Sequence, residues 1–98
     1  MKGFILVAHG SRRAAANDEI AAFAGALAEG MGDKFAVIGH GFWELAEPSL
    51  EQAIDTQVAA GATDIRLFPY FLAQGKHVVK DLPSVLEQKR EQYPQLSI

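Results

Sequence analysis

The chain of 98 residues is short enough for one domain and long enough to bury a small hydrophobic core. Its 49% hydrophobic and 21% charged residues exclude a disordered chain, and its formal net charge of −3 argues against nucleic-acid binding. No apolar run approaches the ~20 residues that cross a bilayer, and the absence of cysteine excludes disulfides and thiolate metal sites. We therefore expect a cytoplasmic protein that binds neither nucleic acid nor membranes.

An unbroken apolar run from Phe4 to Ala8 opens the chain. Such a run is typical of a strand covered on both faces, as in the centre of a parallel sheet. We expect Asn17 to cap the following helix, which ends near Gly30 and Gly32. The apolar residues of this helix repeat at helical spacing and are Ile20, Phe23, Ala24, Leu27 and Met31.

The middle of the chain repeats this alternation of strand and helix. Residues 35–38 begin a second strand, which extends to Trp43 at most. The segment Glu47-Pro48-Ser49 then predicts the start of a second helix, with proline in its first turn, and Gly61 stops that helix.

A third strand is predicted over residues 64–71, followed by a loop from Ala73 to Lys80. Asp81 is expected to cap a third helix that carries Pro83 in its first turn. Residues 96–98 resemble the start of a fourth strand. Strands that alternate with helices imply a parallel α/β sheet with right-handed crossovers. A strand order of 2-1-3 would make the first and third strands neighbours at the point where the order reverses.

Histidines follow the strands of this predicted sheet. His9 comes directly after the first strand, and His77 lies in the loop after the third. Open α/β sheets bind ligands outside the carboxyl ends of their strands, where the strand order reverses. We therefore expect His9 and His77 to face one another across one crevice, with Glu44 and Glu47 on the same rim. Imidazole and carboxylate groups suit borderline divalent ions and also proton transfer near neutral pH.

Each of these residues also has a structural interpretation. A single histidine in a small domain is often only a hydrogen-bonded structural residue, and His40 in the second strand fits either the pocket or the core. Glu47 beside Pro48 can be a helix cap, so we prefer Glu44 as the functional carboxylate.

The loops that carry the two histidines also carry a cluster of basic residues in an acidic protein. These residues are Arg12, Arg13, Lys76 and Lys80. A positive rim of this kind attracts a ligand with several carboxylates or phosphates, although the same charges can be solvated or paired with nearby aspartates. Aromatic residues near the rim, including Phe42, Trp43 and Tyr70, suit a flat apolar ligand or belong to the core.

Three segments in register resemble a known family, and together they span nearly the whole chain. They are VAHGSR at 7–12, FWELAEPSL at 42–50, and PYFL at 69–72 with GKHV at 75–78 and DLP at 81–83. The chain resembles the small class II chelatases, the CbiX-like and SirB-like sirohydrochlorin cobaltochelatases and ferrochelatases. On this resemblance, residues 1–98 form one chelatase-like domain, a three-layer α/β/α half-domain with strand order 2-1-3-4, which lacks the family's usual final strand and helix.

The resemblance implies an ATP-independent chelatase that inserts Co²⁺ or Fe²⁺, with Ni²⁺ as a further candidate, into sirohydrochlorin without an organic cofactor. His9 and His77 match the family's metal-binding and proton-accepting histidines, and Glu44 matches its acidic partner. The substrate's carboxylates would be held by Ser11, Arg12, Arg13 and Lys76. Two copies of a short chain would form a homodimer.

Two other functions compete with this prediction. A non-catalytic protein of the same fold could bind a tetrapyrrole or a divalent metal. A histidine phosphatase also has a strand that leads into His-Gly, but its signature places an arginine where this chain has Ala8, so the phosphate clamp is missing.

Overall fold

Strands and helices alternate along the chain, as the sequence predicts. The computed structural model describes residues 1–70 and 76–98, with the backbone alone for residues 76–81. The elements are β1 (Lys2–Ala8), α1 (Ala14–Met31), β2 (Val37–Phe42), α2 (Leu50–Ala59), β3 (Asp64–Tyr70) and α3 (Lys76–Gln92). Within the described ranges, no helix is long and apolar enough to cross a membrane.

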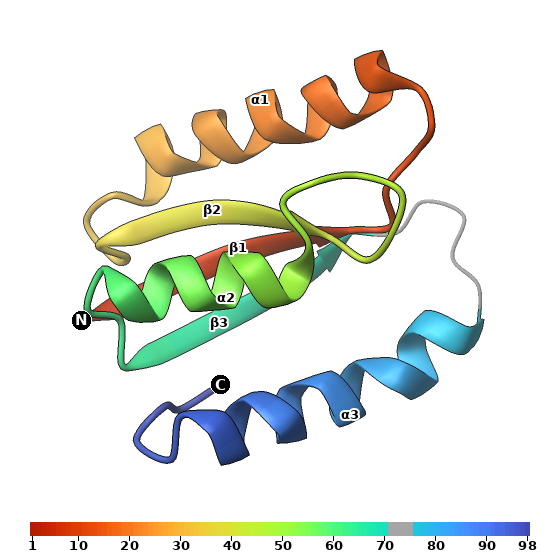
Figure 1. Cartoon of the computed structure of the whole chain (residues 1–98). Coiled ribbons are helices and arrows are strands. Elements are labelled where there is room, and N and C mark those ends of the chain that lie inside the picture. Colours follow the sequence, from red (N-terminus) through yellow and green to blue (C-terminus); the bar gives the residue numbers. More distant parts are fainter. Residues whose placement is uncertain (71–75) are drawn as a thin grey trace.

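The strands form a parallel sheet in the order β2-β1-β3, which confirms the predicted order of the first three strands (Figure 1). At their carboxyl ends, Ala8 of β1 pairs with Phe42 of β2 and with Tyr70 of β3. Ser97 adds a single parallel bridge to Asp64 on the outer side of β3. The predicted fourth position therefore holds one bridge and not a strand.

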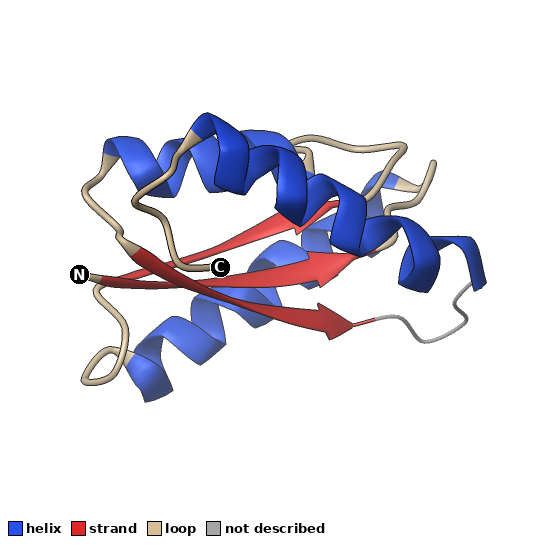
Figure 2. Ribbon diagram, turned by 90° about the horizontal axis from the view of Figure 1, so that it is seen from below, coloured by secondary structure: helices blue, strands red, loops and turns tan. Residues whose placement is uncertain are grey.

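The sheet lies between two layers of helices, with α1 on one face and α2 and α3 on the other (Figure 2). Residues Ile5 to Val7 of β1 are completely buried, as expected of a central strand. Ile5 and Val7 belong to the main core cluster, which they form with Leu50, Ala53, Ile54, Ala62, Ile65 and Leu96. Each large aliphatic side chain buried there contributes about 1.5–3 kcal/mol to stability.

The α1 face is less completely covered than this core. Phe4 packs against Phe35 and Phe68, with ring centroids 5.2 and 6.3 Å apart, but Phe68 is 46% exposed. Only Ala24 of the predicted apolar face of α1 is fully buried, and Phe23 is 37% exposed. The reason is that α1 is the only helix on this face among the described residues, and it packs chiefly over β2.

The predicted helix starts need correction in all three cases. Asn17 does not cap α1, because Arg13 occupies the N-cap position without a side-chain hydrogen bond. For α2 the N-cap is Ser49, whose hydroxyl accepts a hydrogen bond from the amide of Gln52, while the Gln52 side chain accepts one from the Ser49 amide. This capping box places Pro48 before the helix and not in its first turn.

The third helix begins earlier than predicted. It starts at Lys76, so the expected loop up to Lys80 is wrong for its last residues, and Asp81 lies inside the helix. Residues 71–75 lie outside the part of the chain that the structure describes. Pro83 is also inside α3 and not in its first turn.

Gly41 lies in β2 where the start of α2 passes close to the strand. A Cβ atom at this position would lie 2.9 Å from the Cα of Leu50 and 3.1 Å from the Cβ of Ala53. Glycine therefore allows the start of α2 to pack directly on β2.

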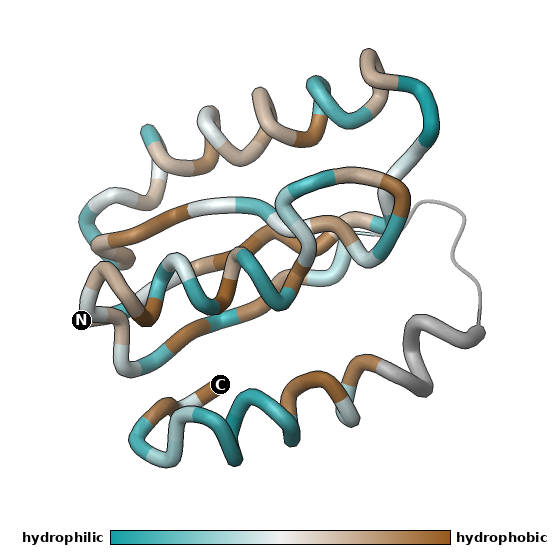
Figure 3. The backbone as a smooth tube through the Cα atoms, viewed as in Figure 1, coloured by the Kyte–Doolittle hydropathy of each residue, from teal (hydrophilic) through white to brown (hydrophobic). Residues whose placement is uncertain are grey.

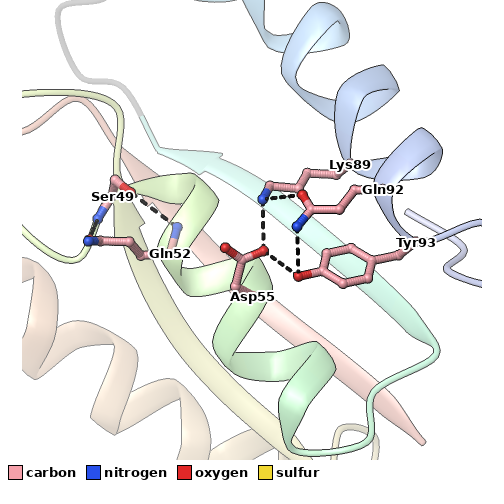
Figure 4. A network of polar contacts seen from close by, with 6 residues as sticks. All are labelled: Ser49, Gln52, Asp55, Lys89, Gln92 and Tyr93. Carbon is pink, nitrogen blue, oxygen red and sulfur yellow. Dashed lines mark hydrogen bonds and ion pairs between the residues drawn. The ribbon is translucent and has the colours of Figure 1, made fainter.

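A polar network joins α2 to α3 (Figure 4). Asp55 accepts hydrogen bonds from the Lys89 ammonium and the Tyr93 hydroxyl, each at 2.7 Å, and Lys89 also donates to Gln92 at 2.9 Å. Burial acts to raise the pKa of Asp55, but the hydrogen bonds from Lys89 and Tyr93 and the charge of Lys89 outweigh it and leave that pKa lowered. The bond to Asp55 is the main reason that the pKa of Tyr93 is raised.

Candidate functional site

The site forms where two neighbouring parallel strands end. β1 ends at Ala8 and β2 at Phe42, so the residues that follow emerge side by side at one edge of the sheet. His9 Nε2 lies 3.0 Å from Glu44 Oε1, and the two side chains are 41% and 54% exposed. The structure thus brings together one predicted histidine and the preferred carboxylate within hydrogen-bonding distance and in reach of solvent.

The backbone on both sides fixes this pair. Beyond the strands, the amide of Trp43 donates to the carbonyl of Ala8 at 2.8 Å, and the amide of Glu44 donates to the carbonyl of His9 at 2.9 Å. Figure 1 shows the resulting arch, in which the loop after β2 curves beside the segment that leaves β1.

Gly10 is required at the point of closest approach between these segments. Its φ is +97°, and a Cβ atom there would overlap the carbonyl oxygen of Glu44. A side chain at position 10 would therefore push Glu44 away from His9, and glycine also adopts this φ without strain.

Each ring nitrogen of His9 faces an oxygen atom. Nδ1 lies 3.1 Å from the carbonyl oxygen of Gly10, while Nε2 faces the carboxylate of Glu44. A neutral imidazole has one donor and one acceptor nitrogen, so it can donate to only one of these oxygens, whereas the protonated ring can donate to both. An imidazole nitrogen that carries no proton can take one up or offer a lone pair to a metal ion.

The segment after His9 carries the predicted anion-binding residues. Arg12 and Arg13 are exposed, and Figure 3 shows the connection from β1 to α1 as a polar stretch. Ser11 accepts a hydrogen bond from the amide of Arg13 at 3.1 Å, so its hydroxyl has a local structural partner. The first turn of α1 contains no acidic residue, which leaves the positive end of the helix dipole uncompensated beside the arginines.

Asn17, which the sequence predicts as a helix cap, instead holds the backbone of the loop before α1. Its side chain accepts a hydrogen bond from the Ser11 amide at 3.0 Å and donates to the Ser11 carbonyl at 2.8 Å. The missed signal was a short polar side chain placed to bond the backbone of the preceding loop, as asparagine does in turns. Gly10 was missed for a related reason, because its need depends on a segment distant in sequence.

The side chains of His77, Lys76 and Lys80 lie outside the described part of the structure. Their backbone begins α3, and Figure 1 shows this helix starting on the side of the molecule where the strands end. The predicted approach of His77 to His9 therefore stays a prediction.

The remaining predicted residues are His40, the aromatic residues near the rim, and Glu47. His40 is half-buried in β2 and packs edge-on against Phe42, with ring centroids 5.4 Å apart, and burial lowers its pKa. Phe42 is 2% exposed, and Trp43 packs against the main core cluster, so the aromatic residues beside the pair belong mainly to the core. Glu47 lies further along the loop, and no ion pair joins it to a histidine among the described side chains.

Within the described side chains, no group of three histidine or acidic residues could hold a metal ion. His9 and Glu44 supply two ligand atoms of the types that borderline divalent metals accept. A complete coordination sphere needs ligands beyond this pair, from water, substrate or another part of the protein.

The fold and the site together define a parallel α/β protein with a histidine–carboxylate centre at the carboxyl edge of its sheet. A profile of the CbiX family matches residues 3–98, so the chain belongs to the CbiX family. This finding confirms the family that the three sequence segments predict.

Individual relatives agree with this membership. The sirohydrochlorin cobaltochelatase of Methanosarcina acetivorans is 36% identical over 84 residues, which cover 86% of this chain and 63% of the relative. The chloroplastic sirohydrochlorin ferrochelatase of Arabidopsis thaliana is 33% identical over 95 residues, which cover 97% of this chain and 41% of the relative. The chain therefore spans less than two thirds of either relative.

Among solved structures, the sirohydrochlorin chelatase SirB from Bacillus subtilis in complex with cobalt has the same fold. The two structures superpose with a TM-score of 0.78 and 32% sequence identity, over 97% of this chain and 40% of SirB.

Proposed function

We propose that this protein is a sirohydrochlorin chelatase, which inserts Co²⁺ or Fe²⁺ into the tetrapyrrole without ATP or an organic cofactor, and that it acts in the cytoplasm. The observation that carries the proposal is the His9–Glu44 pair, 3.0 Å apart at the carboxyl edge of a CbiX-family sheet. The names of the relatives, which include cobaltochelatases and ferrochelatases, support both candidate metals.

The chemistry of metal insertion suits this pair. Metalation of a porphyrin-type macrocycle replaces two pyrrole N–H protons by a divalent cation, so a base and a site for the incoming ion must lie close together. In the proposed mechanism, Glu44 keeps the ring of His9 oriented. His9 binds the ion or takes up a pyrrole proton, and the exposure of both side chains leaves them open to a ligand.

The basic segment beside the pair suits the rest of the substrate. Sirohydrochlorin carries several carboxylates around a flat macrocycle, and guanidinium groups bind carboxylates with two parallel hydrogen bonds. We assign this task to Arg12 and Arg13, which are exposed next to His9, with Ser11 as a further contact. Lys76 and His77, at the start of α3, complete the proposed site as a second cation and a second histidine.

A homodimer is part of the same proposal. This chain covers 40% of SirB, so SirB has room for a second unit of similar size. A second copy of this chain would supply that unit. Sedimentation equilibrium would give twice the chain mass if the protein is a dimer, and the chain mass itself if it is not.

The test of the proposed function is a metal-insertion assay under anaerobic conditions. Purified protein is mixed with metal-free sirohydrochlorin and Co²⁺ or Fe²⁺, and the change in the absorption spectrum is followed with time. We expect insertion well above the rate of the protein-free mixture. Binding of the tetrapyrrole with no acceleration would instead support the non-catalytic carrier.

A further inference from the structure

Leu45 follows Glu44 directly and has a backbone conformation that leucine rarely adopts. Its φ is 68°, and it is the one non-glycine residue with a positive φ among residues 1–70 and 76–98. In this left-handed region the Cβ of leucine crowds its own backbone, whereas glycine or asparagine is accommodated with less strain. The loop therefore contains a leucine where its backbone favours a different residue type.

The hydrogen bonds around the loop impose this conformation. On one side, the amides of Trp43 and Glu44 are bonded to the carbonyls of Ala8 and His9. On the other side, the Phe42 amide donates to the carbonyl of Pro48 at 2.8 Å, which closes the loop at its base. The backbone of Leu45 is thus held between two fixed ends, in the same loop that positions the carboxylate of Glu44.

The fold makes little use of the Leu45 side chain. Its 51% exposure exceeds that of every other large hydrophobic residue in the described part of the chain. The neighbouring Trp43 packs against the main core cluster, and Phe42 is 2% exposed. Burial therefore gives no reason for leucine here, and the backbone conformation opposes it.

We infer that Leu45 is a substrate-contact residue whose side chain packs against the apolar face of the planar macrocycle. The inference rests on the proposed function and adds to it a residue that positions the substrate. Strained residues concentrate at active sites and ligand clamps, where the surrounding structure holds them in place. Leu45 directly follows Glu44 in the chain, and Glu44 lies 3.0 Å from His9, so a ligand that contacts Leu45 is held close to this pair.

The substitution Leu45→Gly separates this role from a structural one. Glycine adopts the positive φ without strain, so the variant should unfold at the same temperature as the wild type or above it. Loss of the apolar contact should weaken the binding of metal-free sirohydrochlorin about tenfold, and raise KM more than it lowers kcat. Leu45→Met keeps an apolar side chain of similar volume and should retain most of the affinity.

The measurements are fluorescence titrations with metal-free sirohydrochlorin and thermal melts of the wild type and both variants. Equal affinity of the wild type and Leu45→Gly would overturn the inference and leave the proposed function intact. Equal loss of affinity in Leu45→Gly and Leu45→Met would also overturn it, because the effect would then not depend on apolar contact. A wild type that binds no sirohydrochlorin would overturn both.

Discussion

Glu44 contacts His9 twice. Its carboxylate lies 3.0 Å from the imidazole Nε2 of His9, and its backbone amide donates a hydrogen bond to the His9 carbonyl. The side-chain contact and the backbone contact thus join the same two residues. Their relative position depends on the sheet register, in which Ala8 lies opposite Phe42. The fold therefore places the pair before any ligand arrives, which is the condition for efficient proton transfer or metal delivery.

Removal of the imidazole should abolish most of the activity. We expect His9→Ala to lower the rate of Co²⁺ insertion by at least about 100-fold, the usual contribution of a positioned general base. The side chain is 41% exposed, so the circular dichroism spectrum and the thermal midpoint should change little. Insertion at the wild-type rate by a folded His9→Ala variant would remove His9 from the mechanism.

The role of the Glu44 carboxylate can be tested against that of Glu47, the other carboxylate of the same loop. Glu44→Gln keeps the size of the side chain but loses its charge beside His9, and we expect insertion to slow by about 10-fold to 100-fold. Glu47→Gln is the matched control, since Glu47 lies in the same loop and has no ion pair with His9. Comparable losses in the two variants would show that Glu44 was chosen wrongly.

Gly10→Ala tests whether the close approach of the two segments holds the site together. The new methyl group would overlap the Glu44 carbonyl, and the alanine backbone would have to adopt a φ of +97°, so we expect a loss of about 2 kcal/mol or more in unfolding free energy. Urea denaturation provides the measurement. Gly25→Ala is the control, because its Cβ has no neighbour within 4 Å and alanine should stabilise α1 by up to about 1 kcal/mol. Similar effects of both substitutions would contradict the account.

The network between α2 and α3 predicts a pH dependence. Asp55→Asn removes the charge that faces the nearly buried Lys89, and we expect it to cost about 1 kcal/mol at pH 7, a value reduced because Asp55 is 44% exposed. The pKa of Asp55 is lowered on folding, so its contribution is complete above the unfolded value of about 4 and is lost as the pH falls through the folded value. The difference between wild type and Asp55→Asn in urea titrations should therefore shrink on acidification. A difference that stays constant down to pH 2 would rule out this origin.

His40 should affect stability more than catalysis. Burial lowers the pKa of His40, so the unfolded chain binds a proton more readily and stability falls as the pH drops below about 6.5. In His40→Gln this part of the acid sensitivity should disappear, and thermal melts between pH 7 and 5 would reveal the change. Metal insertion should fall less than in His9→Ala, and an equal loss would mean that the histidines were ranked in the wrong order.

The sequence predicts the strands well because their signal is local. The apolar run of residues 4–8 leaves no polar face, so it belongs at the centre of a sheet, and the alternation with helices fixes parallel pairing. Placement of His9 at the carboxyl edge follows directly from these two facts.

Helix starts and loop contacts depend on partners that the local pattern does not reveal. Asn17 has the residue type of a cap, but it bonds the backbone of Ser11 instead. Pro48 suits the first turn of a helix, yet the reciprocal bonds between Ser49 and Gln52 start α2 after it. The conformation of Leu45 depends in the same way on hydrogen bonds that join two distant segments.

The central claim is that His9 and Glu44 form the site where the metal ion enters. Its most direct test is a crystal structure of the protein with Co²⁺, in which anomalous scattering locates the ion. We predict an ion about 2.0–2.2 Å from His9 Nε2, the distance expected for imidazole ligands of such metals. An ion bound elsewhere, with the ring of His9 still bonded to Glu44 and out of its reach, would contradict the claim.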